Sequence, residues 1–275
     1  MKYIINAVIM LFSLAIGAQS NSLEIPLSSP GQPGKLDVYI KSGEIIIKGS
    51  DRQDVLIEYM ENLEEEDDDD DHSRSKGKWK GKKKGLKKIG STNLNLKITE
   101  ENNYVKVKRT SLAKSIKVII TIPRNFEVEA QNYMGGNITV EDIQGELSLD
   151  SYTGNIYASR IVGSVSASTY AGEITVGIDE LIAENAMSFS TYSGEIDITF
   201  PTDSKLDYKM KTNWGDIYSD IELTVKDVKA EVMKEQEGNA YKVYTDGWTF
   251  ASSNGGGPEM KIKTEYGSIY LRAKE

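Results

Sequence analysis

The sequence contains no cysteine and only one histidine, and both gaps limit the chemistry that the chain can perform. Without cysteine there is no disulfide, no thiolate nucleophile and no cysteine-ligated metal site. The lone histidine, His72, lies in a highly charged stretch, whereas a catalytic triad or a histidine metal site needs a positioned side chain. The sequence also lacks a glycine-rich phosphate loop and a dinucleotide-binding fingerprint. We therefore predict no catalytic residue, no metal site and no cofactor.

The chain also has fewer basic than acidic residues. It has 33 lysines and arginines against 42 aspartates and glutamates, which gives a net charge of -9. Proteins that bind nucleic acid need a basic surface to neutralise the phosphates. We therefore expect no nucleic acid among the partners of this protein.

The chain has one long apolar run, at its N-terminus. The run from Ile4 to Ile16 follows Lys2 and precedes the small residues Gly17 and Ala18. This order is typical of a secretory signal peptide, which we place at residues 1–18. An uncleaved membrane anchor is the alternative, but the run is shorter than the about 20 residues that a spanning helix needs. We expect no transmembrane anchor after cleavage, and a location in the periplasm, at the cell surface or outside the cell.

What the sequence does have is a repeat. Glycine recurs every nine residues through the middle of the chain, and each glycine is followed by alternating polar and apolar residues. This period-two alternation is typical of a strand with one buried and one exposed face. The glycine predicts a turn at which a side chain would clash. The regular copies begin at Gly136, Gly145, Gly154, Gly163 and Gly172, with further copies at Gly194, Gly215 and Gly267 and an early one at Gly43.

Such short strands are not stable alone, but stacked copies that hydrogen-bond to one another are. Tyr152 and Tyr170 lie 18 residues apart, twice the glycine spacing, which predicts a coil of two strand–turn units. We therefore predict an all-β chain folded as a single-stranded β-solenoid, similar to a parallel β-helix, with β-strand caps. A β-sandwich of hairpins is the alternative. In the solenoid, one inner row contains Ile138, Ile156 and Ile174, with Leu147 and Val165 opposite.

The chain divides into four parts. They are the signal peptide at 1–18, N-terminal strands or a cap at 19–60, a disordered acidic–basic insert at 61–90, and the repeat domain with a C-terminal cap at 91–275. Alternation outside the repeat predicts further strands at Lys35–Ile47, Asp54–Met60, Ser91–Thr99, Tyr104–Thr110, Ser115–Ile122, Lys205–Thr212, Ile221–Val232 and Ala240–Thr245.

The insert has two halves of opposite charge. Eight consecutive acids at Glu64–Asp71 precede nine basic residues within Arg74–Lys88. Such blocks bury little apolar area, so we predict a solvated loop whose deletion leaves the β circular-dichroism signal and the melting transition largely intact. The alternatives are weak divalent-cation binding by the acids and attachment of the basic half to anionic polysaccharide or lipid.

Two sets of repeated side chains are candidates for a surface function. Tyr152, Tyr170 and Tyr192 lie two residues before a repeat glycine, and Trp214 and Tyr266 occupy a neighbouring position. These aromatics either form a structural ladder or face a ligand. The second set follows the glycines and includes the carboxylates Glu173, Glu195 and Asp216, which act either as turn formers or as the carboxylates of a carbohydrate-active enzyme.

The copies of Tyr-x-Gly-[Asn/Glu]-Ile-x-[Val/Ile/Ala] from Tyr152 to Ile198 resemble a bacterial putative-adhesin family of β-strand-repeat proteins. The segment Lys35–Asp51 is similar to the usual opening of that family. The resemblance implies a β-solenoid-like domain, an envelope or surface location and no established enzymatic activity. The expected partner is an unidentified envelope protein or polysaccharide. Besides an adhesin-like protein and a carbohydrate-active enzyme, an envelope scaffold or sensor accessory protein remains an alternative.

Overall fold

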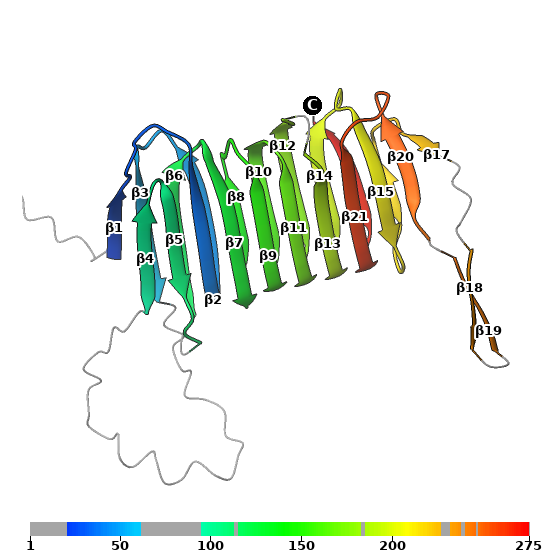
Figure 1. The fold of residues 1–275 in the computed structure, drawn as a ribbon, viewed down its shortest axis with the longest axis horizontal. Coiled ribbons are helices and arrows are strands. Elements are labelled where there is room, and N and C mark those ends of the chain that lie inside the picture. Colours follow the sequence, from blue (N-terminus) through cyan, green and yellow to red (C-terminus); the bar gives the residue numbers. More distant parts are fainter. Residues whose placement is uncertain are drawn as a thin grey trace, which may run out of the picture.

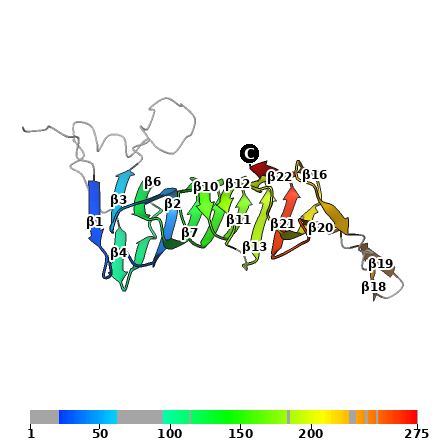
Figure 2. The same cartoon turned by 90° about the horizontal axis from the view of Figure 1, so that it is seen from above.

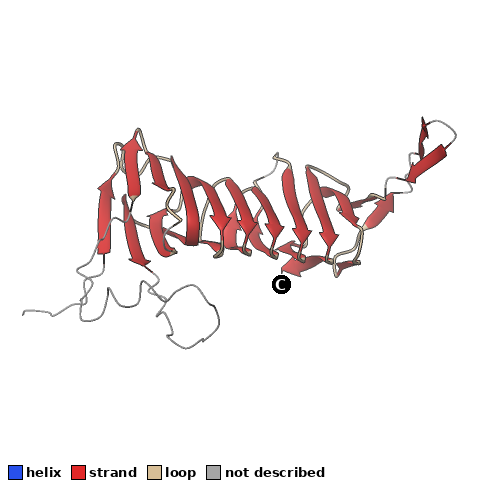
Figure 3. Ribbon diagram, turned by 90° about the horizontal axis from the view of Figure 1, so that it is seen from below, coloured by secondary structure: helices blue, strands red, loops and turns tan. Residues whose placement is uncertain are grey.

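The structure is a computed structural model that describes residues 21–61, 95–112, 115–182, 185–226, 232–237, 240–245 and 247–274. Within these residues the chain forms strands and their connections and no helix, and the strands stack along one axis into a rod (Figures 1 and 3). No helix that could cross a membrane is therefore found in these ranges. The predicted signal peptide and nearly all of the acidic–basic insert lie outside the described residues.

Two facing sheets, here called sheet A and sheet B, make up the rod (Figure 2). In spatial order, sheet A consists of β1 (Asn21–Pro26), β3 (Asp54–Glu61), β6 (Ile116–Pro123), the second half of β2 (Gly34–Ser50), β8 (Ile138–Glu141), β10 (Ile156–Val162), β12 (Ile174–Glu180), β14 (Ile196–Pro201), β22 (Ile269–Lys274) and β16 (Ile217–Ser219).

Sheet B consists of β4 (Leu96–Glu101), β5 (Tyr104–Arg109), the first half of β2, β7 (Phe126–Met134), β9 (Leu147–Thr153), β11 (Val165–Ala171), β13 (Met187–Ser193), β21 (Glu259–Tyr266), β15 (Leu206–Thr212), β20 (Thr249–Ser253) and β17 (Thr224–Lys226). A separate hairpin contains β18 (Val232–Glu237) and β19 (Ala240–Thr245). The pairings within the central part of the rod are parallel, as a solenoid requires.

The inner rows confirm the predicted solenoid. Ile156 pairs in parallel register with Ile138 on one side and with Ile174 on the other, and all three side chains are fully buried. Val165 pairs with Leu147 in the facing sheet. Burying one such side chain stabilises the fold by about 1.5–3 kcal/mol, so a stack of these rows forms a continuous core.

Alternate repeat glycines form a column at one corner of the rod, where each glycine lies against the carbonyl group of the glycine in the neighbouring coil, and Gly145 and Gly163 lie against each other at the other corner. A Cβ atom at Gly154, where φ is +138°, would lie 2.1 Å from the carbonyl oxygen of Gly136. No side chain fits at that distance, which is why the turn requires glycine. The column contains, in spatial order, Gly43, Gly136, Gly154, Gly172, Gly194, Gly267 and Gly215.

This spatial order differs from the chain order at two places. The coil of β2 lies between the coil of β5 and β6 and the coil of β7 and β8. The last coil, β21 and β22, lies between β13 and β14 on one side and β15 and β16 on the other.

The last strands of the chain therefore do not form the expected C-terminal cap. The segment 19–60 contributes an internal coil as well as the edge strand β1, and the C-terminal strands are internal. The far end of sheet B is formed instead by the antiparallel strands β20 and β17. The physical reason is that every coil carries the same glycine and the same alternation, so the repeat does not specify which coils are neighbours.

A column of buried polar side chains lies inside the glycine corner. The hydroxyl of Thr169 donates a hydrogen bond to the Gly154 carbonyl oxygen at 3.1 Å, and that of Thr191 donates to Gly172 at 3.0 Å. These contacts satisfy carbonyl groups that the turn withdraws from the sheet. The same role is filled by Thr264 toward Gly194 at 2.9 Å, by Thr212 toward Gly267 at 2.8 Å and by the Asn132 amide toward Gly43 at 2.5 Å.

Candidate binding face

The outer face of sheet B carries a ladder of stacked tyrosines. The ring of Tyr152 lies 5.3 Å from that of Tyr170, with planes 8° apart, and the ring of Tyr170 lies 4.9 Å from that of Tyr192, with planes 1° apart. Tyr133 extends the stack beyond Tyr152, at 5.2 Å and 20°. The four side chains are 45–49% exposed, so the ladder is a solvent-facing ridge.

The ring spacing follows from the strands that hold the rings. Neighbouring strands lie about 4.7–4.9 Å apart, and identical residues in register bring their rings to a similar separation. Because the rings stack face to face, each covers the faces of its neighbours. The ladder therefore offers solvent mainly ring edges and a row of phenol groups, which contact apolar and hydrogen-bonding partners alike.

The two outlying aromatics continue the ladder in a different geometry. Tyr266 meets Tyr192 edge-on, with ring planes 74° apart and centroids separated by 5.4 Å, and Trp214 stacks on Tyr266 at 6.4 Å. The change arises because Tyr266 pairs with Ser193, one position later than Tyr192. The neighbouring Tyr266 phenol raises the pKa of Tyr192 above its ordinary value.

The sequence pattern had not identified Tyr133. Tyr133 lies three residues before Gly136 instead of two, because Gly135 adds one residue at this turn. A search for the repeat that allowed a one-residue insertion would have found it.

Beside the ladder lies a flat floor of small polar side chains, here called the serine floor. Ser166 pairs in register with Ser148 and Ser188, and Ser168 pairs with Asp150 and Ser190. The Ser168 hydroxyl donates a hydrogen bond to Asp150. A shallow hollow of about 400 Å³ lies along this junction and is lined by Ser168, Tyr170, Ser190, Tyr192, Lys263 and Glu265, among others.

The candidate carboxylates lie at the corner between the sheets, where the strands of sheet A begin. Glu173 and Glu195 follow successive glycines of the column, but Ser268 lies between Glu195 and Asp216 because the last coil is inserted there. The Tyr270 hydroxyl donates to Glu195 and the Tyr218 hydroxyl donates to Asp216, both at 3.2 Å. All three carboxylates are exposed.

Residues at this position also support the neighbouring turns. The side-chain oxygen of Asn155 accepts a hydrogen bond from the Glu173 backbone N–H at 2.9 Å, and Asn137 accepts from the N–H of Asn155 at 3.0 Å. This is the chemistry of turn-forming residues. Within the described residues, no group of three or more histidine, aspartate or glutamate side chains is arranged to hold a metal ion.

The repeat region also matches a known family. Residues 132–246 match the family model described as Toastrack DUF4097. This segment is similar to a Toastrack domain and spans less than half of the chain. This match confirms the predicted resemblance to a bacterial family of β-strand-repeat proteins. A search of curated proteins found no match.

Two solved structures are similar to this chain. One, a "putative cell adhesion protein" from Clostridium sporogenes, is 12% identical, with 93% of this chain and 100% of that chain covered and a TM-score of 0.42. The other, a "putative adhesin" from Bacteroides fragilis, is 11% identical, with 92% of this chain and 96% of that chain covered and a TM-score of 0.40.

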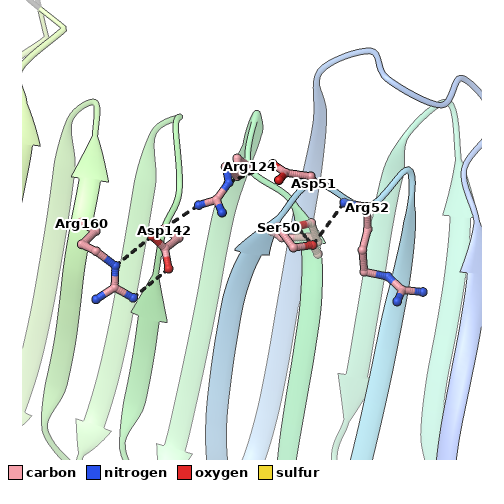
Figure 4. A network of polar contacts seen from close by, with 7 residues as sticks. Ser50, Asp51, Arg52, Arg124, Asp142 and Arg160 are labelled. Atoms are coloured by element: carbon pink, nitrogen blue, oxygen red, sulfur yellow. Dashed lines mark hydrogen bonds and ion pairs between the residues drawn. The ribbon is translucent and has the colours of Figure 1, made fainter.

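Ion pairs link the coils at the second corner of the rod (Figure 4). The Arg160 guanidinium donates two hydrogen bonds to Asp142, at 2.8 and 2.7 Å, and Arg124 bridges Asp142 and Asp51. Arg160 holds the pKa of Asp142 below its ordinary value. This network joins successive turns and is a structural counterpart of the glycine column.

A larger hollow of about 600 Å³, which no sequence pattern predicts, lies where β12 is connected to β13. Its walls include Asp179, Leu181, Ile182, Met187 and Lys205. Asp179 also forms an ion pair with Lys274 at 2.8 Å, which links this connection to the last strand.

Proposed function

We propose that this protein is an exported, adhesin-like rod that binds an envelope or cell-surface partner through the outer face of sheet B. The observation that carries the proposal is the half-exposed stack of Tyr133, Tyr152, Tyr170 and Tyr192 beside the serine floor. Contiguous exposed aromatic surface marks interaction sites, and tyrosine is enriched at the centre of protein interfaces.

Export is part of this proposal and rests on the sequence. The charged start, apolar run and small residues of 1–18 have the order of a signal peptide. A chain without cysteine gains nothing from an oxidising compartment, but a continuous β-core needs no disulfide. We place the mature protein in the periplasm, at the cell surface or outside the cell.

We further propose that the protein acts by binding and not by catalysis. Glu173, Glu195 and Asp216 are exposed at a corner of the rod, and the hollows of about 600 and 400 Å³ are lined by other residues. Glycoside hydrolysis needs two carboxylates that flank a bound sugar within an enclosed, positioned geometry. An open row of turn residues does not provide that environment.

The test compares two matched pairs of stacked tyrosines. Tyr170→Ser/Tyr192→Ser removes two rungs of the ladder on sheet B, and Tyr218→Ser/Tyr270→Ser removes the stacked pair on sheet A, whose rings lie 5.3 Å apart. Binding of each mature protein to a glycan array and to isolated envelope polysaccharide and protein fractions is measured. Release of reducing sugar is measured on the same samples.

We expect the sheet B variant to lose binding and the sheet A variant to keep it, with no sugar released by either. Equal binding by both variants would refute the role of the ladder. If the protein released sugar and this release disappeared in Glu173→Gln or Glu195→Gln, the protein would instead be a carbohydrate-active enzyme. If both variants still bound a membrane protein from the envelope fraction, the partner would contact another face of the rod, which would favour a scaffold or sensor role.

A further inference from the structure

The outward columns of sheet B change from serine to lysine along the rod. Beyond β13, the positions that carry Ser188 and Ser190 are taken by Lys261 and Lys263 on β21. On the next strand, β15, Lys209 pairs in register with Lys261, and Lys211 pairs with Lys263. These four residues, here called the lysine square, lie on adjacent strands about 4.8 Å apart.

Like charges placed directly opposite each other destabilise a pair of strands, so this arrangement has an energetic cost. At the other end of the same face, lysines meet carboxylates: Lys35 lies 3.1 Å from Glu129, and Lys106 lies 3.2 Å from Asp37. In the part of the chain that the structure describes, Lys209, Lys261 and Lys263 form no such ion pair. The ammonium groups of these three lysines are therefore not neutralised by a direct ion pair among the described residues.

Trp248 contacts the ammonium groups of three of the four lysines. The Nζ atom of Lys209 lies 4.8 Å from the centroid of the Trp248 ring, and those of Lys261 and Lys211 lie 5.6 and 5.7 Å away. Cation–π attraction to one ring offsets part of the repulsion without neutralising the charge. The result is a positioned cluster of positive charge on a protein whose net charge is -9.

The lysine square is continuous with the proposed binding face. Lys263 lines the same hollow as Tyr170, Tyr192, Ser168 and Ser190. An extended molecule that lies along the rod would therefore pass over serine hydroxyls beside the tyrosine ladder and then reach the ammonium groups.

We infer that the lysine square binds the charged groups of an anionic polysaccharide whose hydroxyls contact the serine floor. The inference rests on the proposed function and names the chemical class of the ligand. Lysine is a compact point charge and does not distinguish carboxylate, sulfate and phosphate groups, so the class is defined by charge. A linear glycan suits this face better than a membrane does, because the floor exposes hydroxyls and not apolar side chains.

The test measures binding of the full mature protein to dextran sulfate, polygalacturonate and neutral dextran at several salt concentrations. Lys261→Gln/Lys263→Gln removes two charges from the lysine square. Lys48→Gln/Lys117→Gln removes two charges from the outer face of sheet A and is the matched control. We expect the first variant to bind the two polyanions about 30-fold more weakly at low salt and the control to change less than about twofold.

Folding of the variants is checked by thermal melting. Removing one side of an in-register pair of like charges should leave the melting temperature of Lys261→Gln/Lys263→Gln unchanged or higher. A loss of binding in that variant then reports the charge and not the fold.

Three outcomes would overturn the inference. The first is equal binding of dextran and dextran sulfate. The second is a loss of binding only when Lys82, Lys83 and Lys84 of the insert are changed to Gln. The third is tighter binding to phosphatidylglycerol vesicles than to every polymer, provided that this binding depends on the lysine square. The proposed function survives each of these outcomes if the tyrosine variant still loses its partner. It fails separately if the tyrosine variant binds as the unmodified protein does.

Discussion

Ile269, in the last strand of the chain, lies in parallel register beside Ile196, and both side chains are fully buried. The C-terminal coil is therefore an internal layer of the core. We expect deletion of residues 259–275 to abolish the cooperative melting transition, because the coils on either side would lose their partners. Circular dichroism during heating measures this effect.

Deletion of β1 is the matched control for that experiment. Residues 21–26 form a mostly exposed edge strand that, among the described strands, pairs only with β3. Removing them should lower the melting temperature only modestly. If the two deletion variants had the same melting temperature and the same cooperativity, the internal position of the last coil would be contradicted.

Gly172 and Gly177 provide a second matched pair, because both lie in one coil and only one belongs to the glycine column. A Cβ atom at Gly172 would lie 2.2 Å from the Gly154 carbonyl oxygen, whereas a Cβ atom at Gly177 would lie 3.9 Å from its nearest neighbours. We expect Gly172→Ala to destabilise the rod by about 2–4 kcal/mol and Gly177→Ala to be neutral or stabilising by up to about 1 kcal/mol. Urea unfolding measures both, and similar midpoints would argue against the column.

The buried threonine column makes a third prediction. Thr169→Val keeps the side-chain shape but leaves the Gly154 carbonyl oxygen without its 3.1 Å hydrogen bond. Leaving such a group unsatisfied costs about 1–3 kcal/mol. Thr175→Val, on the exposed face of sheet A, should change the free energy of unfolding by less than about 0.5 kcal/mol. A larger loss for Thr175→Val than for Thr169→Val would show that the column is unimportant.

Tyr208 predicts how stability changes at high pH. Its side chain is 2% exposed, and burial raises its pKa from the ordinary value of 10.0 to about 12. Between pH 10 and 12 the unfolded chain has released this proton while the folded chain still binds it, so stability falls as the pH rises. The total effect is on the order of 2 kcal/mol.

Tyr208→Phe isolates this effect. The Ser253 hydroxyl lies 3.0 Å from the Tyr208 hydroxyl and donates its own proton to the Ser204 carbonyl oxygen at 2.7 Å, so Tyr208 is the donor to Ser253. The substitution therefore leaves Ser253 with a partner. Urea unfolding of this variant should show a shallower decline from pH 10 to pH 12 than that of Tyr133→Phe. Identical declines would contradict the assignment to Tyr208.

The repeat predicted the coil but not the order of the coils. Nine-residue glycine spacing and period-two alternation were sufficient for the row of Ile138, Ile156 and Ile174, because both features act within a coil and between adjacent copies. No local sequence pattern predicts that β21 and β22 insert between two coils that are consecutive in the sequence. It depends on which long-range pairings bury the most surface, and equivalent coils compete for the same neighbours.

The composition of the candidate face depends on that permuted order. Lys261 and Lys209 lie opposite each other only because the last coil is inserted before β15, and the same insertion places Ser268 between Glu195 and Asp216. The tyrosine ladder was visible in the sequence as a spacing. The lysine square was not visible, since its two halves are more than one coil apart in the chain.

The absence of cysteine makes a direct test of the binding face straightforward. Ser188 and Thr175 are both exposed, on the outer faces of sheet B and sheet A respectively. Ser188→Cys and Thr175→Cys each introduce one thiol, whose rate of maleimide labelling is measured with and without the envelope fraction that binds the unmodified protein. We predict protection of the thiol at position 188 and unchanged labelling at position 175. Protection at 175 with free labelling at 188 would show that the partner binds the opposite sheet.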